Sequence, residues 1–317
     1  MTPDLIRKAR ERISDLLPPT PLVRSHALSR EARRTVWLKL ETQQPTGSFK
    51  VRPAFNGILA QQEEARRRGV LTSSSGNFAQ AVAYAARETG VDAQIVMMGS
   101  SSPYKIAQTE ALGARVVLTG NSFEERWKTT YRLEAETGRL LLHPYDSEET
   151  IAGDGTLGLE LLEQLPGDFT VAIPVSGAGL VAGVAAAVKS SRPGCRVLGA
   201  QPEANASLAR SLEAGRPVSV GPVRTIADAL IASQPGLRSF QIARLWVDQV
   251  VLAGEQEMAA AVRRLAIEQK IIAEAGGAVA VATLLAGKLP AGEGDLVCVI
   301  SGGNILPSAL ASLLTQK

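Results

Sequence analysis

The chain has 317 residues, 45% of them hydrophobic and 21% charged, which predicts a globular protein large enough to divide into two domains. The net charge of +3 comes with no basic stripe carrying interleaved aromatic residues, so nucleic-acid binding is not expected. Two cysteines without a CxxC pattern exclude a disulfide framework and favour a cytoplasmic location, and two histidines far apart in sequence argue against a zinc site.

The first predicted strand, 36–40, leads into a loop of small residues that contains a lysine. Lys50 ends the run Pro45-Thr46-Gly47-Ser48-Phe49-Lys50. A lysine packed among apolar groups loses hydration of its charged form, so its pKa falls and its amine becomes nucleophilic. A surface loop lysine is the ordinary alternative, because lysines are seldom catalytic. The loop therefore offers a candidate for covalent catalysis that needs support from other segments.

The next strand, 70–72, ends in a polar loop that opens a helix. Ser73, Ser74, Ser75, Gly76 and Asn77 offer hydroxyls and backbone N–H groups at the start of a helix predicted over 78–89. A helix N-terminus of this kind suits a small carboxylate. Strands are then predicted at 93–98, 115–118 and 140–142, with a helix over 122–137.

The predicted strand 170–175 is followed by Ser176-Gly177-Ala178-Gly179-Leu180 and a helix over 180–190. Small residues let backbone N–H groups converge at the helix start, which predicts a phosphate site without a charged side chain. The spacing fits neither a P-loop nor a dinucleotide fingerprint, so a single phosphate is expected. The same glycines and Pro174 interrupt the longest uncharged stretch, 169–188, so no membrane span is expected.

Further strands are predicted at 196–200, 249–252 and 296–300, with a helix over 255–269. The last strand leads into Ser301, whose neutral hydroxyl can donate to a ring nitrogen. Alternating strands and helices indicate βαβ units and mainly parallel sheet. Ligands bind at the carboxyl ends of strands in such sheets, and three of these strands end in small polar loops. The pattern predicts a ligand cleft, although each loop by itself could be a simple turn.

Taken together, these segments resemble the fold type II pyridoxal-phosphate enzymes, and among them the serine/threonine dehydratases and serine racemases. The resemblance runs in order along nearly the whole chain. It is carried by the stretches 46–50, 74–77, 174–180 and 301–304, and by His143-Pro144-Tyr145-Asp146, Ile151-Ala152-Gly153-Asp154-Gly155-Thr156, Thr225-Ile226-Ala227-Asp228 and Ala273-Glu274-Ala275-Gly276-Gly277-Ala278.

The resemblance implies a role for each matched position. Lys50 is expected to bond covalently to pyridoxal 5′-phosphate and to move the α-proton of the substrate. The expected cofactor contacts are Phe49 and Asn77 at the ring, Ser301 at the ring nitrogen, and Ser176, Gly177, Ala178, Gly179 and Leu180 at the phosphate. Ser74, Ser75, Gly76 and Asn77 are expected to receive the substrate carboxylate, and Ser75 matches the second acid/base of racemases.

A serine beside the ring nitrogen leaves that nitrogen largely neutral, whereas an aspartate would keep it protonated and strengthen the electron sink. This favours prompt loss of a β-hydroxyl, so the expected reaction is dehydration of L-threonine or L-serine to a 2-oxo acid and ammonia. The alternatives are serine racemisation, supported by Ser75, and dehydration of a bulkier substrate such as phenylserine. A protein that only binds an amino acid is a further alternative, against which Lys50 speaks.

The sequence departs from the family pattern at several positions. Phe78 replaces a usual histidine, and could either reshape the pocket or pack behind the cofactor. Pro53 replaces a glycine and Asp154 a glutamine or histidine, and Ser176 and Ala178 replace two glycines of the phosphate loop, a change expected to be mild because both are small. Gln201 and Ser207 stand where some relatives bind a divalent metal, so no metal site is expected.

The expected architecture is a two-domain α/β fold of the tryptophan synthase β type, with mainly parallel sheets flanked by helices. Residues 1–51 and 146–317 would form the large cofactor-binding domain, and residues 52–145 the small domain. The expected partners are an amino acid substrate and, by family resemblance, a second copy of the chain in a homodimer.

Overall fold

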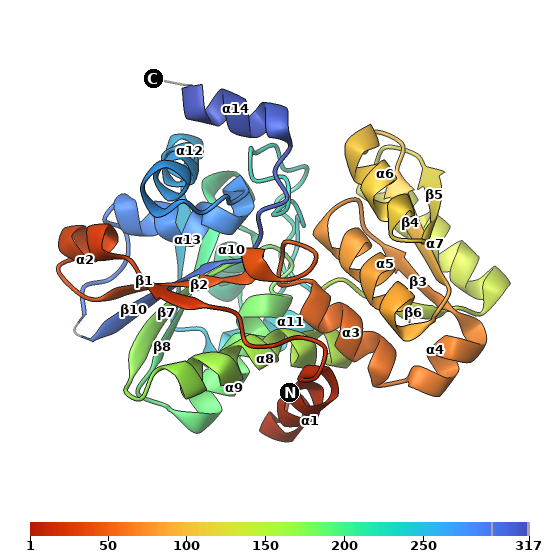
Figure 1. Cartoon of the computed structure of the whole chain (residues 1–317), viewed down its shortest axis with the longest axis horizontal. Coiled ribbons are helices and arrows are strands. Elements are labelled where there is room, and N and C mark those ends of the chain that lie inside the picture. Colours follow the sequence, from red (N-terminus) through yellow and green to blue (C-terminus); the bar gives the residue numbers. More distant parts are fainter. Residues whose placement is uncertain (293, 316–317) are drawn as a thin grey trace.

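Two β-sheets organise the structure, a computed structural model that describes residues 1–292 and 294–315 (Figure 1). The larger sheet has the strand order β1-β2-β10-β7-β8-β9 and the smaller one β5-β4-β3-β6. Every neighbouring pair is parallel except β1 and β2, which are antiparallel. The strands of the larger sheet are β1 (Leu22–Arg24), β2 (Val36–Leu40), β7 (Phe169–Pro174), β8 (Arg196–Pro202), β9 (Gln249–Ala253) and β10 (Asp295–Ile300). Those of the smaller sheet are β3 (Val70–Ser73), β4 (Ala93–Met98), β5 (Arg115–Thr119) and β6 (Leu140–Leu142).

Helices cover both faces of the larger sheet. The helices of this part are α1 (Pro3–Ile13), α2 (His26–Ala32), α8 (Glu148–Gln164), α9 (Gly179–Ser191), α10 (Ser207–Ala214), α11 (Leu237–Trp246), α12 (Glu255–Arg264), α13 (Ala275–Leu285) and α14 (Pro307–Thr315). One core joins α8, α9 and α11 to one face, and a second joins α12 and α13 to the other. Burial on both faces explains why β7 and β10 consist almost entirely of apolar residues.

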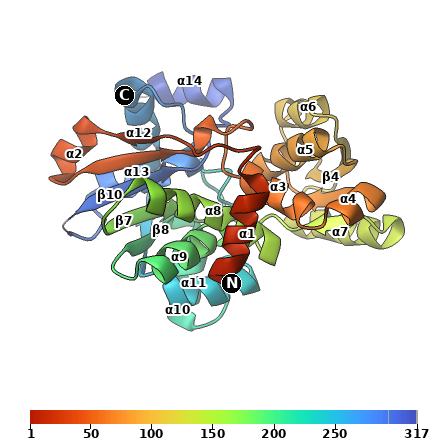
Figure 2. The ribbon, with the colours of Figure 1, turned by 60° about the horizontal axis from the view of Figure 1, so that its bottom comes forward.

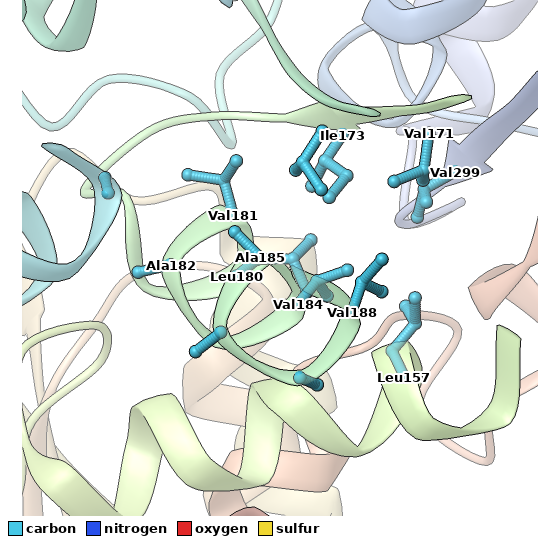
Figure 3. Packing of buried hydrophobic residues seen from close by; sticks show 14 of the residues in the cluster. Leu157, Val171, Ile173, Leu180, Val181, Ala182, Val184, Ala185, Val188 and Val299 are labelled. Carbon is cyan, nitrogen blue, oxygen red and sulfur yellow. The ribbon is translucent and has the colours of Figure 1, made fainter. Parts of the chain in front are cut away.

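Helix α9 packs closely against both the larger sheet and α8. In Figure 3 its residues Val181, Val184 and Val188 lie beneath the strand residues Ile173 and Val299. On its other side α9 meets α8 so closely that a methyl group on Gly183 would collide with the carbonyl oxygen of Ile151. A helix that is apolar all round is buried between layers, and here small residues set the spacing of those layers.

The smaller sheet lies beside the larger body and carries its own core (Figures 1 and 2). Its helices are α3 (Val51–Leu59), α4 (Gln62–Arg68), α5 (Asn77–Thr89), α6 (Pro103–Ala111) and α7 (Phe123–Thr137). Ser122 and Glu125 form a capping box at the start of α7, and Gly90 ends α5 in the left-handed conformation. The four strands all fall inside the predicted small domain, 52–145, whose boundaries stay a prediction.

The predicted elements agree with the structure in type and differ at some ends. The helix expected over 255–269 is instead α12 followed by a π-helical turn, η3 (Leu265–Gln269). The short strand β1 and the 3₁₀ turns η1 (Glu41–Gln43) and η2 (Glu203–Asn205) were not predicted. No helix in the described part of the chain is long and apolar enough to cross a membrane.

Candidate active site

Three neighbouring strands of the larger sheet deliver the predicted site residues to one edge. Strand β10 lies between β2 and β7, so the loops that follow these three strands meet at their carboxyl ends. Phe49 N donates to Ser301 O (3.0 Å), and Gly303 N donates to Gly47 O (2.9 Å). These bonds fix the lysine loop against the loop after β10, although some 250 residues separate them in sequence.

A cavity of about 360 Å³ opens at this edge and extends to the smaller sheet. It is lined by every residue that the sequence predicts for the site, namely Phe49, Lys50, Ser74, Ser75, Gly76, Asn77, Ser176, Gly177, Ala178, Gly179, Leu180 and Ser301. A volume of this size suits a small organic cofactor with an amino acid.

Lys50 is one of the residues that line this cavity. Its Nζ donates to the carbonyl oxygen of Pro144 (2.5 Å) and lies 4.8 Å from the ring centroid of Phe49 and 5.4 Å from that of Phe78. Burial lowers the pKa of Lys50, against the opposing charge of Asp154. A depressed pKa raises the fraction of neutral, nucleophilic amine near neutral pH. Phe78 is only 2% exposed, lies against the lysine and lines the cavity, so both of its expected roles stay predictions.

The loop between β7 and α9 presents backbone N–H groups to the cavity. The first backbone hydrogen bond of α9 runs from Ala182 N to Ala178 O (3.0 Å), so the preceding N–H groups have no partner inside the helix. Together with the helix dipole they make this loop suitable for an anion, as expected for the predicted phosphate cradle, a name used here for residues 176–180. Ala178 itself adopts a left-handed conformation, with φ of 73°. Replacing glycine with alanine at this position therefore costs backbone strain. The expectation of a mild effect considered only the small size of the side chain.

The loop between β3 and α5 provides the opposite wall. Ser75 Oγ accepts hydrogen bonds from Met98 N (3.0 Å) and from the guanidinium of Arg126 (3.4 Å). Arg126 also donates to Ser73 Oγ (3.0 Å) and is 7% exposed, and burial lowers its pKa to about 10. No ion pair of Arg126 occurs within residues 1–292 and 294–315. A buried guanidinium that lines a cavity without a carboxylate partner favours an anionic ligand.

A second polar cluster at the cavity involves Asn77, Glu274 and Asn304. Asn77 Nδ2 donates to Glu274 Oε1 (2.6 Å), and Asn304 Nδ2 donates to Asn77 Oδ1 (2.8 Å). Burial raises the pKa of Glu274 to about 7. Asn77 comes from the smaller sheet and the other two residues from the larger body, so the cluster orients Asn77 across the cleft.

Glu274 and Tyr145 lie in stretches that carry the family resemblance, but the sequence predicts no role for either residue. No sequence motif contains Arg126. Tyr145 lies so close to the cradle that a methyl group on Gly177 would collide with its ring. The only signal for Arg126 is its place beside Trp127 and Thr130 on the buried face of α7. A charged residue on such a face needs a partner or a ligand.

Gln201 and Ser207, which stand where some relatives bind a metal, form a hydrogen bond with each other. Gln201 Nε2 donates to Ser207 Oγ (3.3 Å), and Gln201 Oε1 accepts from Leu208 N (3.1 Å). Within the described ranges, no group of three or more His, Cys, Asp or Glu is arranged to hold a metal ion.

The fold and the cavity bring a lysine with a lowered pKa, a helix N-terminus and the Ser301 hydroxyl together at one edge of the larger sheet. A family model described as pyridoxal-phosphate dependent enzyme matches residues 13–302, and the chain belongs to this family. An L-threonine ammonia-lyase of Thermotoga maritima is 41% identical over 300 residues, which cover 95% of this chain and 75% of the relative. The residues present fit the cofactor, since the cradle offers free N–H groups, Lys50 an amine and Ser301 a neutral hydroxyl.

Solved structures share the fold of this chain. Maize serine racemase superposes with a TM-score of 0.94 at 34% identity, covering 98% of this chain and 96% of that chain. A threonine deaminase from T.th. superposes with a TM-score of 0.90 at 40% identity, covering 96% of this chain and 99% of that chain. Both agree with the fold type II architecture predicted from the sequence.

Proposed function

We propose that this protein is an ammonia-lyase that removes water from a small 3-hydroxy amino acid, with L-threonine or L-serine as the substrate. The observation that carries the proposal is the cavity in which Lys50, the cradle and Ser301 converge from three adjacent strands. Relatives named threonine ammonia-lyase and threonine deaminase, at 40–41% identity, support the choice of reaction.

The residues of this chain divide the work between them. Bound pyridoxal phosphate supplies the electron sink that acidifies the α-hydrogen and lets the β-hydroxyl leave. Residues 176–180 would hold its phosphate, and the N-terminus of α5 with Ser74 to Asn77 would hold the substrate carboxylate. Lys50 Nζ, with its lowered pKa, would take the α-proton. The neutral Ser301 hydroxyl would keep the sink weak, so that elimination outpaces other outcomes.

Arg126 would add positive charge to the wall of the pocket that is proposed to receive the carboxylate. Its guanidinium contacts Ser73 and Ser75, next to the loop proposed for the carboxylate. A charge buried in this way raises the affinity for a carboxylate, because the surrounding low dielectric strengthens the attraction. The proposed orientation places the α-carboxylate on the side of the smaller sheet and the α-hydrogen toward Lys50.

Racemisation of serine is the second candidate. Ser75 lines the same cavity, and the adjacent Arg126 cation lowers the cost of placing negative charge on its Oγ. A hydroxyl in that setting could return a proton from the face opposite Lys50. The similarity to maize serine racemase supports this reading as well.

One experiment separates the candidates. The purified holoenzyme is mixed with L-threonine, L-serine and phenylserine, and 2-oxo acid, ammonia and the enantiomer ratio are followed together. We expect 2-oxo acid and ammonia in equal amounts from L-threonine or L-serine. Enantiomer exchange without 2-oxo acid would identify a racemase, and the absence of both with all substrates would refute the proposal. Lys50→Ala should abolish turnover and the visible absorption of the bound cofactor.

A further inference from the structure

Asp154 is a buried acid for which the reaction described above has no use. It lies in the second turn of α8, is 0% exposed, and neither carboxylate oxygen has a hydrogen-bond partner in the described structure. Leaving a buried carboxylate unpartnered is costly, so such a group calls for an explanation. It also stands where the family pattern has an uncharged or basic side chain.

The position of Asp154 connects it with the phosphate cradle. A Cβ atom placed on Gly179, the first residue of α9, would lie 2.9 Å from Asp154 Oδ2 and 2.8 Å from the carbonyl oxygen of Tyr145. The carboxyl group therefore lies directly behind the helix N-terminus that offers its N–H groups to the cavity. A negative charge there interacts favourably with the positive end of the helix dipole.

The charged groups around Asp154 come from several elements. Lys50 and Arg52, at the start of α3, stabilise its ionised form, and Glu41 of η1 opposes it. Tyr145 adds a phenol whose pKa is raised to about 12 by burial, so it stays neutral. The first three turns of α9 carry no ionisable side chain. Burial outweighs the two cations and raises the pKa of Asp154 to about 7, so both of its forms are accessible near neutral pH.

Binding of the cofactor changes this balance in one direction. The phosphate would bring negative charge to the same helix N-terminus, and like charges brought close together in a dry interior disfavour joint ionisation. Cofactor binding should therefore favour the protonated form of Asp154.

We propose that Asp154 accepts a proton from solvent as the phosphate of the cofactor enters the cradle, so that cofactor binding is linked to proton uptake and weakens as the pH rises above neutrality. This inference concerns the cofactor and does not depend on the identity of the substrate. It assigns to this chain a coupling that a glutamine at position 154 could not provide.

The test uses the apoprotein and a phosphate-bearing cofactor analogue without the aldehyde, 4′-deoxypyridoxine 5′-phosphate, which cannot react with Lys50. Titration calorimetry in two buffers of different ionisation enthalpy counts the protons exchanged. Wild type should take up about one proton more per site than Asp154→Asn near pH 8, and its affinity relative to the variant should fall about tenfold per pH unit above the pKa of the free acid. Protons exchanged by the analogue itself are common to both proteins and cancel.

Glu274→Gln is the matched control, because Glu274 is another buried acid of the site with a pKa near 7 that contacts Asn77 instead of the cradle. It should keep the excess proton uptake. Equal uptake by wild type and Asp154→Asn, or loss of the excess in Glu274→Gln, would overturn the assignment.

Thermal unfolding of the apoproteins checks that the variants fold, and Asp154→Ser supplies a second neutral side chain. Wild type alone offers one more readout. The infrared carbonyl band of a protonated, buried carboxylic acid should appear when the analogue binds at pH 8. Its absence would refute proton uptake by Asp154 even if no variant folded.

Discussion

Arg126 is 7% exposed and lines the cavity, yet no sequence motif points to it, and the proposal places it beside the substrate carboxylate. Hydrogen bonds that involve a charged group contribute about 1.5–3 kcal/mol, so we expect Arg126→Met to lower kcat/KM about 10- to 100-fold, mostly through KM. The comparison is Arg132→Met on the same helix, whose side chain is 59% exposed and pairs with Glu136. Steady-state kinetics on the better substrate measure both. Equal effects of the two substitutions would contradict a role of Arg126 in binding.

Ala178 allows a test of backbone strain at the cradle. Its φ of 73° is costly for any residue with a Cβ atom, and glycine adopts it freely. After allowing for the greater freedom of glycine in the unfolded chain, we expect Ala178→Gly to raise the free energy of unfolding by about 0.5–1 kcal/mol. Chemical denaturation of the apoprotein measures this. A loss of stability would show that the strain is absent or offset by lost packing.

At the scale of elements, the contact between α8 and α9 sets where the cradle lies. Gly183→Ala should drive a methyl group into the carbonyl oxygen of Ile151, separate the two helices and destabilise the protein by about 1–3 kcal/mol. Gly167→Ala is the control, because a Cβ atom there meets nothing within 4 Å. Denaturation midpoints and cofactor affinity should fall together for the first variant and stay near wild type for the second.

The elements that could be predicted are those whose pattern is local. Residues 36–40 and 93–98 are predicted as strands and are strands, because β-branched and other apolar residues fill mostly buried positions. Residues 140–142 also form a strand, as their apolar run predicts, although two of the three are only partly buried. Strand β1 has only three residues, two of them exposed, and exists because it pairs with β2. Its sequence carries no signal that is independent of that partner.

The site residues that follow a local sequence pattern could be predicted, and those that depend on tertiary contacts could not. The lysine loop, the cradle and Ser301 follow strands directly and could be read from small residues after apolar runs. Arg126 belongs to a helix rich in charged residues, and its contacts with Ser73 and Ser75 depend on how α7 packs on the smaller sheet. Asp154 departs from the family pattern, which the sequence shows, but its place behind Gly179 follows from the packing of α8 on α9. Neither contact is encoded locally.

At the scale of the whole molecule, a largely buried cluster of charges joins five elements next to the site. Glu160 of α8 contacts Lys39 of β2 (2.5 Å), Arg52 of α3 (2.6 Å) and Arg10 of α1 (3.0 Å). Glu41 pairs with Arg52 from the other side (2.8 Å). Because Arg52 follows Lys50 by two residues, this cluster anchors the segment that carries the reactive amine.

Removing one charge from the cluster should be severe. Glu160→Gln leaves buried cations without full compensation, and we expect a loss of about 3–5 kcal/mol of unfolding free energy. Glu163→Gln, one turn along α8 with a side chain that is 60% exposed, is the control and should change stability by less than about 0.5 kcal/mol. Urea denaturation of both variants measures the difference. Similar stability of the two would mean that the cluster contributes little.

Low pH should destabilise the protein through the carboxylate of Glu160. Burial alone would raise the pKa of Glu160, but Arg52 and Lys39 together outweigh it and hold the pKa below its ordinary value of 4.5. A carboxylate with a lowered folded-state pKa stabilises the protein above its unfolded-state pKa, and this contribution is lost as the pH falls through the folded-state value. Wild type should therefore lose stability below about pH 4.5 more steeply than Glu160→Gln. Parallel stability curves would exclude Glu160 as the source.

The central place of β10 in the larger sheet has a consequence for how the protein is made. A ribosome produces the lysine loop first and the cradle next, but the strand that sets the distance between them only after residue 294. Until that strand inserts between β2 and β7, the two halves of the site have no fixed separation. We therefore expect cofactor capture to wait until β10 has been made, and a nascent chain halted before β10 should leave the cofactor in solution.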